Sequence, residues 1–212
     1  MSDINLETET SVPEEHFEDR NDQKPKREGL AYELLDLVKT FVICAISVFL
    51  ITTFVVKPVQ VEGISMVPTL EDNEVGIMNV IDLKIHDINR YDVVVVSSKK
   101  TNGDNWVKRV IGMPGDTIYA EDDVVYVNGL AIDEPYLDTD YVKGMRNQGN
   151  LFTQDLAKVT LGKDEYFLMG DNRPVSHDSR AVGPFKHEDF VGKDVYVLYP
   201  FSKIKAVRNG AN

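Results

Sequence analysis

Cysteine is almost absent from this sequence, whose 212 residues contain a single thiol at Cys44. One cysteine cannot form a disulfide within the chain, and its place inside an apolar run leaves no thiol elsewhere for catalysis. A sortase-like transpeptidase, which needs an extracytoplasmic thiol, is therefore excluded. The cysteine content is compatible with either side of a membrane and does not assign a compartment.

Basic residues are also scarce, since 23 Lys and Arg stand against 35 Asp and Glu, for a formal net charge of −12. This balance argues against a nucleic-acid partner, because no broad basic face is available to neutralise phosphates. Histidine is limited to four residues, and His86, His177 and His187 lack the spacing of metal ligands. We therefore expect no metal and no cofactor.

The sequence has only one long uncharged apolar run, the seventeen residues 40–56. As a helix this run is about 25 Å long, the short end of a membrane span, and Lys39 and Lys57 flank it. A buried core helix is the alternative, but a β-branched run between lysines fits a membrane better. The leader is too long for a cleaved signal peptide, and no small-x-small site follows. We predict an uncleaved transmembrane signal-anchor over residues 39–57.

The distribution of basic residues predicts the orientation of this helix. The basic residues before it are Arg20, Lys24, Lys26, Arg27 and Lys39. Lys57 is the only one within twenty residues after it. The positive-inside rule places residues 1–38 in the cytoplasm, as a polar and disordered tail, and residues 58–212 outside the cytoplasmic membrane.

The remainder of the chain shows strand patterns and little helix, which predicts a mostly β fold. The β-branched runs between turn residues are 59–62, 75–80, 92–98, 106–111, 165–169 and 194–199. Residues 123–132 read as a hairpin, because Asn128-Gly129 supplies the positive φ values of a tight turn. Short helices are expected at 151–157 and 187–191. We read residues 117–163 as a small β insertion or cap.

Two segments carry candidate chemistry. The strand pattern 59–62 ends at Gly63, and Pro68 prevents a regular continuation, so Ser65 is expected at a chain reversal. Most serines in turns only form the turn. However, Lys108 lies in an apolar, aromatic strand pattern, and a desolvated lysine loses pKa and can act as a base. A solvated strand lysine is the simpler reading of Lys108 taken alone.

Four segments resemble, in order, the motifs of bacterial type I signal peptidases of the Gram-positive-like subtype. They are G-I-S-M-V-P-T-L at 63–70, N-R-Y-D-V-V-V-V at 89–96, V-K-R-V-I-G-M-P-G-D at 107–116 and G-D-N-R-P-V-S-H-D-S-R at 170–180. With the apolar run, the resemblance covers most of residues 38–200. It implies an antiparallel β catalytic domain over residues 58–212, with a small β insertion, preceded by one transmembrane helix.

The resemblance also implies an activity and its partners. It implies a membrane-bound serine endopeptidase that removes N-terminal signal peptides from exported preproteins by cleavage after small-x-small motifs. Such an enzyme uses a Ser/Lys dyad and no cofactor, has the lipid bilayer and preproteins as partners, and works close to the secretion translocon.

Site residues are carried over by matching these motifs. Ser65 corresponds to the nucleophile, and Lys108 corresponds to its general base. Ser176 corresponds to a serine that hydrogen-bonds and orients the lysine. Asp178 and Arg180 correspond to an ion pair that braces the loop against the site.

The same resemblance implies how the substrate is held. Val61, Met66 and Val107 match positions that line pockets for small residues at −1 and −3, and an extended peptide would add to nearby strand edges. Some relatives have a serine two residues before the nucleophile as an oxyanion donor. Here that position is Gly63, so the Ser65 N–H is the one donor assigned.

Three alternatives stay open at this point. A Ser–His–Asp triad could be drawn with Ser65, His177 and Asp178, although adjacent residues usually point in different directions. A membrane-anchored β-rich binding module would explain the apolar run and the strands but not the serine and lysine segments. A related self-cleaving Ser–Lys protease would carry a DNA-binding domain where this chain has an apolar run.

Overall fold

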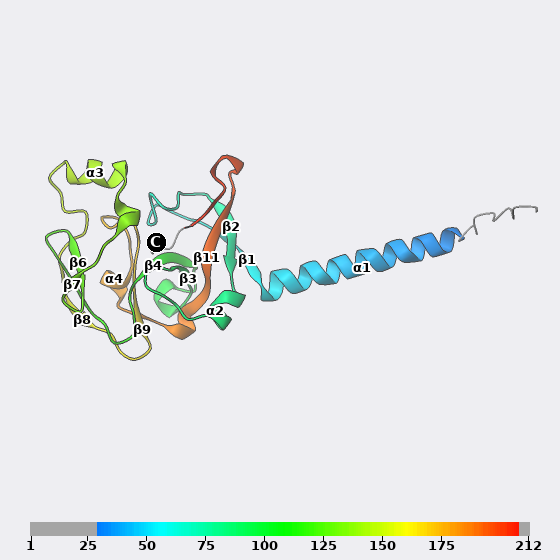
Figure 1. Ribbon diagram of the computed structural model, residues 1–212, viewed down its shortest axis with the longest axis horizontal. Helices are drawn as coiled ribbons and strands as arrows, with labels where there is room; N and C mark the ends of the chain where they lie inside the picture. Colours follow the sequence, from blue (N-terminus) through cyan, green and yellow to red (C-terminus); the bar gives the residue numbers. More distant parts are fainter. Residues whose placement is uncertain (1–28, 208–212) are drawn as a thin grey trace, which may run out of the picture. The chain divides into compact units, whose positions relative to one another are not determined.

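The computed structural model describes residues 29–207 of the chain (Figure 1). In this part the fold is mostly antiparallel β in two sheets, with one long apolar helix near the N-terminus. The mostly β fold class expected from the sequence is confirmed. The chain divides into two compact units, residues 1–44 and 45–212, and helix α1 contributes to both.

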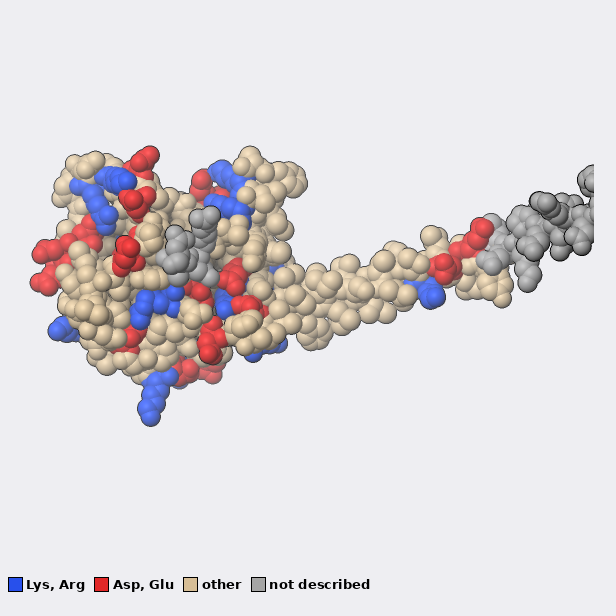
Figure 2. Space-filling model, in the orientation of Figure 1, with Lys and Arg blue, Asp and Glu red and all other residues tan. Residues whose placement is uncertain are grey.

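Helix α1 (Leu30–Phe54) is longer than predicted at its start. Residues 31–54 are long and apolar enough to cross a membrane by length and composition, with a mean hydropathy of 2.3 over their most apolar 18 residues. Figure 2 shows the surface of this helix free of charge over most of its length. The prediction that residues 30–38 belong to a disordered tail is wrong, because they are helical. The predicted tail over residues 1–28 lies outside the described residues.

The helix also ends earlier than predicted. Phe54 is its last residue, and Lys57, expected to flank the helix, lies in the first strand instead. Val55 and Val56 are β-branched, and Pro58 disfavours the helical conformation at the residue before it. Together these three residues convert the chain from helix to strand.

The first sheet has the order β1-β2-β11-β3-β4-β9-β10, and a short strand β12 pairs with β11. Its strands are β1 (Val56–Gln60), β2 (Val75–Asn79), β3 (Val93–Val96), β4 (Trp106–Gly112), β9 (Glu165–Met169), β10 (Phe185–Lys186), β11 (Phe190–Tyr199) and β12 (Lys205–Ala206). Every pairing is antiparallel. Strand β1 pairs only with β2 among the described residues and is therefore an edge of the sheet.

Strand β3 explains why this sheet has core on both faces. Its four valines are completely buried. Val93 and Val95 pack into one apolar cluster with β1 and β2, while Val94 and Val96 pack into a second cluster with Phe185. A strand that is buried on both sides reads as a continuous apolar run rather than as an alternating pattern.

The second sheet has the order β7-β6-β5-β8 and lies beside the first (Figure 1). Its strands are β5 (Thr117–Glu121), β6 (Val124–Val127), β7 (Leu130–Ala131) and β8 (Leu156–Thr160). Asn128 and Gly129 both have positive φ between β6 and β7, so the predicted hairpin is confirmed. Ile118 of β5 packs on Phe167 and Met169 of β9, which joins the two sheets through one apolar cluster.

The remaining elements are short and were mostly not predicted. They are α2 (Ile81–Ile85), α3 (Asp140–Arg146), α4 (Ser179–Val182) and the 3₁₀ turns η1 (Lys99–Thr101), η2 (Pro135–Leu137), η3 (His187–Asp189) and η4 (Phe201–Lys203). The predicted helix over residues 151–157 is wrong, because residues 156 and 157 begin β8. The turn expected at 187–191 is present as η3, but Phe190 already belongs to β11.

Candidate active site

Ser65 lies in the turn that follows β1. The strand path continues through Val61, whose N–H donates to the Glu74 carbonyl, and then reaches Gly63 with φ of +82°. The Gly63 N–H donates to Asp72 Oδ1 at 2.7 Å. A positive φ suits glycine because it has no Cβ, so the glycine permits the bend that presents the serine.

Lys108 reaches this turn from strand β4. Its Nζ donates to Ser65 Oγ at 2.8 Å and to the Val107 carbonyl at 3.0 Å. The amine also lies 5.6 Å from the ring centroid of Trp106. Only 4% of Lys108 is exposed, so the amine is held in an apolar strand environment beside the hydroxyl.

Burial gives this amine an unusual protonation behaviour. Removal from water lowers the pKa of Lys108 from its ordinary value of 10.5 to about 8, against the opposing pull of Asp178 and Asp171. With a pKa near 8, roughly a tenth of the amine is neutral at pH 7, compared with less than a thousandth for an ordinary lysine. Lys108 can therefore accept a proton near neutral pH.

The loop 170–180 packs directly against the serine turn. A Cβ on Gly170 would lie 2.4 Å from the Ser65 carbonyl oxygen, so only glycine permits this approach. Asp178 accepts hydrogen bonds from the Gly170 N–H at 3.0 Å and from Arg180 Nε and Nη2 at 2.8 Å each. Asp178 thus joins the end of the loop, at Arg180, to its first residue, Gly170.

The structure places Ser176 close to the site but does not join it to the lysine. Within residues 29–207, the buried Ser176 Oγ makes no hydrogen bond of good geometry, and its polar neighbour is the Asp178 carboxylate rather than Lys108. The structure does not form the hydrogen bond to Lys108 that the resemblance implied; the partners of Lys108 Nζ are Ser65 Oγ and the Val107 carbonyl. Ser176 packs closely on Gly170: a Cβ added to Gly170 would lie 2.2 Å from Ser176 Oγ.

A groove of about 330 Å³ opens beside the Ser65–Lys108 pair. Its lining includes Val61, Met66 and Val107, the three residues expected to form substrate pockets. All three are at most 7% exposed, so they form the apolar floor of the groove rather than projecting into it.

His177 also lines the groove, with its ring edge-on to Trp106 at 5.4 Å. A Ser–His–Asp triad is not supported by this arrangement. The carboxylate of Asp178 is bonded to Arg180 and to the Gly170 N–H, and Ser65 Oγ is bonded to Lys108.

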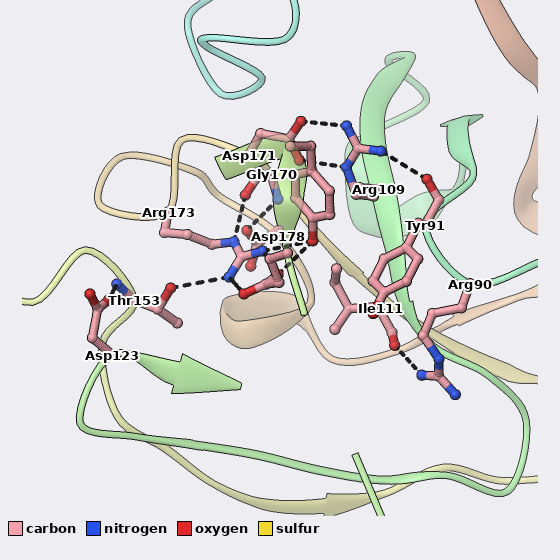
Figure 3. A network of polar contacts seen from close by, with 12 residues as sticks. Arg90, Tyr91, Arg109, Ile111, Asp123, Thr153, Gly170, Asp171, Arg173 and Asp178 are labelled. Carbon is pink, nitrogen blue, oxygen red and sulfur yellow. Dashed lines mark hydrogen bonds and ion pairs between the residues drawn. The ribbon is translucent and has the colours of Figure 1, made fainter. Parts of the chain in front are cut away.

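A buried ion pair joins the lysine strand to the loop 170–180, and Figure 3 shows Arg109 facing Asp171 and the Tyr91 carbonyl. Arg109, the residue after Lys108, donates from Nε and Nη2 to the two carboxylate oxygens of Asp171 at 2.8 and 2.7 Å. Its guanidinium stacks 3.8 Å from the ring centroid of Tyr136 and donates to the Tyr91 carbonyl at 2.9 Å. Thr69, four residues after the serine, donates to the same carboxylate. The pair therefore ties β4, the loop and the serine turn together.

A second buried arginine connects the loop to the second sheet region. Arg173 forms an ion pair with Glu134 and donates to Thr153 Oγ1 and to the Gly170 carbonyl, both at 3.1 Å. From the motif, Asp171, Asn172 and Arg173 are expected to support the fold rather than to react. Sequence reasoning missed Arg109, Glu134 and Tyr136, whose partners are distant in the chain. The only local signal was the pair of adjacent charges, Lys108 and Arg109, inside an otherwise apolar strand that is buried throughout after Trp106.

No group of three or more His, Cys, Asp or Glu side chains that could hold a metal ion occurs in the described part of the chain. The chemistry available at the groove is instead that of a serine hydroxyl bonded to a buried amine. This is the arrangement of a Ser/Lys hydrolase, in which the amine activates the hydroxyl as a nucleophile.

Known proteins with similar sequences are signal peptidases. A model of the family described as "Signal peptidase, peptidase S26" matches residues 34–199. The chain is 36% identical over 187 residues to signal peptidase IB of Staphylococcus aureus (strain Mu50), covering 85% of this chain and 97% of that relative. It is 38% identical over 178 residues to signal peptidase I of Bacillus amyloliquefaciens, covering 82% and 93%.

Among solved structures, a signal peptidase I from Enterococcus faecalis V583 matches with a TM-score of 0.45 and 34% sequence identity, covering 51% of this chain and 97% of that one. The sequence matches establish that the chain belongs to the signal peptidase I family, peptidase family S26. It is a serine endopeptidase that removes signal peptides from exported preproteins. The apolar helix α1 and this membership together indicate membrane anchoring. The binding module and the self-cleaving protease are set aside.

Removal of the buried carboxylate should destabilise the protein strongly. In Asp171→Asn the Arg109 guanidinium, which is fully buried, keeps its charge and loses its ionic partner. We expect the free energy of unfolding to fall by about 3–5 kcal/mol, the usual cost of breaking a buried pair. Denaturant unfolding of the full chain in detergent measures this change.

Asp164→Asn is the matched control, because Asp164 is exposed. Its effect should stay within about 0.5 kcal/mol. Equal stability of the two variants would show that the Arg109–Asp171 pair does not support the fold.

Proposed function

We propose that Ser65 is the nucleophile and Lys108 the general base of this signal peptidase. The observation that carries the proposal is the 2.8 Å hydrogen bond between Ser65 Oγ and an amine that is 4% exposed and has a pKa of about 8. A serine hydroxyl is a weak nucleophile at its own pKa and needs a base within hydrogen-bond reach. Lys108 meets both requirements, distance and pKa.

In the first half of the reaction, Ser65 Oγ attacks the carbonyl carbon of the scissile peptide bond, and its proton passes to Lys108 Nζ. The carbonyl oxygen becomes an oxyanion, which the Ser65 N–H stabilises by a hydrogen bond. The tetrahedral intermediate then collapses. The C–N bond breaks, Lys108 gives its proton to the leaving amine, and the mature protein departs with a new N-terminus.

In the second half, the signal peptide is bound to Ser65 as an ester. Lys108, neutral again, takes a proton from a water molecule, whose oxygen attacks the ester carbonyl. Collapse of the second intermediate returns a proton from Lys108 to Ser65 Oγ and releases the signal peptide as a carboxylic acid, which loses its proton to solvent. Atoms and protons balance with one water consumed per bond cleaved.

The groove supports cleavage after a small-x-small sequence. Its floor consists of the buried side chains of Val61, Met66 and Val107, so little depth is left for large residues at −1 and −3. Strand β1 offers an unpaired edge for an extended peptide, because it pairs only with β2 in the described part of the sheet. Main-chain hydrogen bonds to such an edge bind a peptide without selecting its sequence.

Ser176, Asp178 and Arg180 are proposed as supporting residues. The Asp178–Arg180 pair braces the loop against Gly170, and through Gly170 against the Ser65 carbonyl. The Ser176 hydroxyl lies in this loop beside the Asp178 carboxylate, and we propose that it turns to bond Lys108 once the lysine is protonated.

We place helix α1 in the cytoplasmic membrane as a single span. Its 24-residue span, residues 31–54, measures about 36 Å as a helix, enough to cross a hydrocarbon core of about 30 Å. The excess of Lys and Arg before the helix puts the N-terminus in the cytoplasm and the catalytic region, residues 58–212, outside. There the site would meet preproteins as they leave the secretion translocon.

The purified full chain should cleave a preprotein after the small −1 residue. Ser65→Ala, which removes only the hydroxyl, should abolish cleavage while the protein stays folded. The position of the cut is read by N-terminal sequencing of the product, and folding is checked by circular dichroism. Equal cleavage by both proteins would move the nucleophile elsewhere, and no cleavage by folded wild type would contradict the proposed reaction.

The rate of cleavage should depend on the ionisation of Lys108. Because only the neutral amine can accept the serine proton, activity is lost as pH falls through its pKa of about 8. We expect kcat/KM to rise about tenfold from pH 7 to pH 9 and then level off. A flat profile from pH 6 to 9, with the fold intact at each pH, would rule out a titrating lysine.

The orientation can be tested with single cysteines in a Cys44→Ser background. Ser202→Cys lies in the exposed turn η4 of the catalytic region, and Ser2→Cys lies in the N-terminal tail. We expect a membrane-impermeant maleimide to label Ser202→Cys in cells whose cytoplasmic membrane is intact, and Ser2→Cys only after the membrane is permeabilised. The reverse pattern would contradict the proposed topology.

A further inference from the structure

The peptide group between Ile64 and Ser65 is held at its carbonyl end. The Ile64 oxygen accepts a hydrogen bond from Asn172 Nδ2 at 3.0 Å and another from the Val67 N–H at 3.2 Å. The next carbonyl, that of Ser65, accepts from the Asn172 N–H at 3.0 Å. Asn172 therefore clamps the backbone on both sides of the serine N–H.

This clamp also fixes the direction of the Ser65 N–H. A trans peptide group is planar, and its C=O and N–H point in opposite directions. Holding the Ile64 carbonyl toward Asn172 therefore turns the Ser65 N–H away from Asn172. That N–H has no hydrogen-bond acceptor among the described residues, and both Ile64 and Ser65 line the groove. In the reaction proposed above, this N–H is the donor to the oxyanion.

The side chain of Asn172 is itself oriented by a third residue. Tyr141 Oη donates to Asn172 Oδ1 at 3.2 Å. With the amide turned round, its NH₂ group would face the hydroxyl and its oxygen would face the Ile64 carbonyl oxygen. The Ile64 carbonyl, which can only accept, therefore selects the rotamer in which Nδ2 reaches it, and the Tyr141 hydroxyl stabilises that rotamer by donating to Oδ1. At 3.2 Å this is a long O–H···O contact, so its contribution is modest.

Tyr141 is presented by helix α3, which a small apolar cluster holds in place. Thr139 caps the helix by accepting from the Val142 N–H, and Val142 is completely buried against Leu137 and Phe152. The ring of Tyr141 meets that of Phe152 edge-on, with centroids 6.5 Å apart. The hydroxyl is thereby aimed at Asn172 from a segment more than seventy residues after the nucleophile in the sequence.

We propose that Tyr141 is a positioning residue for the oxyanion donor, acting through Asn172 on the Ile64–Ser65 peptide. The proposal rests on the proposed function, because the Ser65 N–H matters only if an oxyanion forms beside it. It assigns to α3 a part in catalysis, although this helix contributes no group that touches the reacting atoms. An oxyanion donor acts on the transition state, so its misorientation lowers kcat and leaves KM nearly unchanged.

The test is Tyr141→Phe in the full chain, which removes the hydroxyl and keeps the ring against Phe152. Loss of one neutral hydrogen bond of this length should lower kcat by about three- to tenfold, with KM within about twofold of wild type. The rise of kcat/KM with pH, which reports the ionisation of Lys108, should have the same midpoint as in wild type. Tyr126→Phe is the matched control, since Tyr126 stacks on Tyr119 in the second sheet, and its kcat should not change.

A second readout separates positioning from stability. A peptide aldehyde that adds to Ser65 places its oxygen where the oxyanion forms, so its affinity should fall in parallel with kcat. The melting temperature of Tyr141→Phe should match that of Tyr126→Phe. An unchanged kcat, or a loss of kcat that tracks a lower melting temperature and a higher KM, would overturn the inference alone. A folded wild type that cleaves no preprotein would overturn the proposed function, and this inference with it.

Discussion

The structure depends on keeping the Lys108 amine out of water while two carboxylates lie close enough to oppose that effect. Asp178 and Asp171 both favour the charged form of the amine, but each is bonded to an arginine, Arg180 and Arg109. The loss of hydration is the largest effect on the lysine's pKa, and the charge of Arg180 adds to it by opposing the two carboxylates. The two buried ion pairs thus belong to the acid–base chemistry as well as to the scaffold.

Much of the fold was readable from the sequence where side-chain pattern and turn chemistry agree. The β-branched runs around β2, β3 and β4 and the Asn128-Gly129 turn act locally, so a short window contains the information. Helix α3 was missed because only one of its residues, Val142, is completely buried, which leaves no periodic pattern. The run beginning at Leu151 was misread as helix because pairing of β8 with the distant β5 decides its conformation.

The candidate site also has parts that the sequence predicts locally and parts that depend on distant contacts. The serine turn and the lysine strand each carry a local signature, namely Gly63 and Pro68 around Ser65, and the apolar neighbours of Lys108. What holds the two together comes from contacts across 40 to 100 residues, such as those of Thr69 and Arg109 with Asp171. The absence of a Ser176–Lys108 hydrogen bond likewise depends on the direction of the lysine N–H groups, which point to Ser65 Oγ and the Val107 carbonyl. A short window of sequence cannot show such contacts, because they join side chains from three separate segments of the chain.

Strand β1, an edge of the first sheet, contains a proline that limits how much of the edge can pair with another chain. An open sheet edge invites pairing with any extended chain, including a second copy of the protein. Pro58 lies in the middle of this edge strand, where a proline usually turns outward the side that lacks an N–H. Pairing is then restricted to the few residues between Pro58 and Gly63. So short an edge discourages self-assembly, and in the proposed binding mode it would hold a preprotein through few main-chain hydrogen bonds.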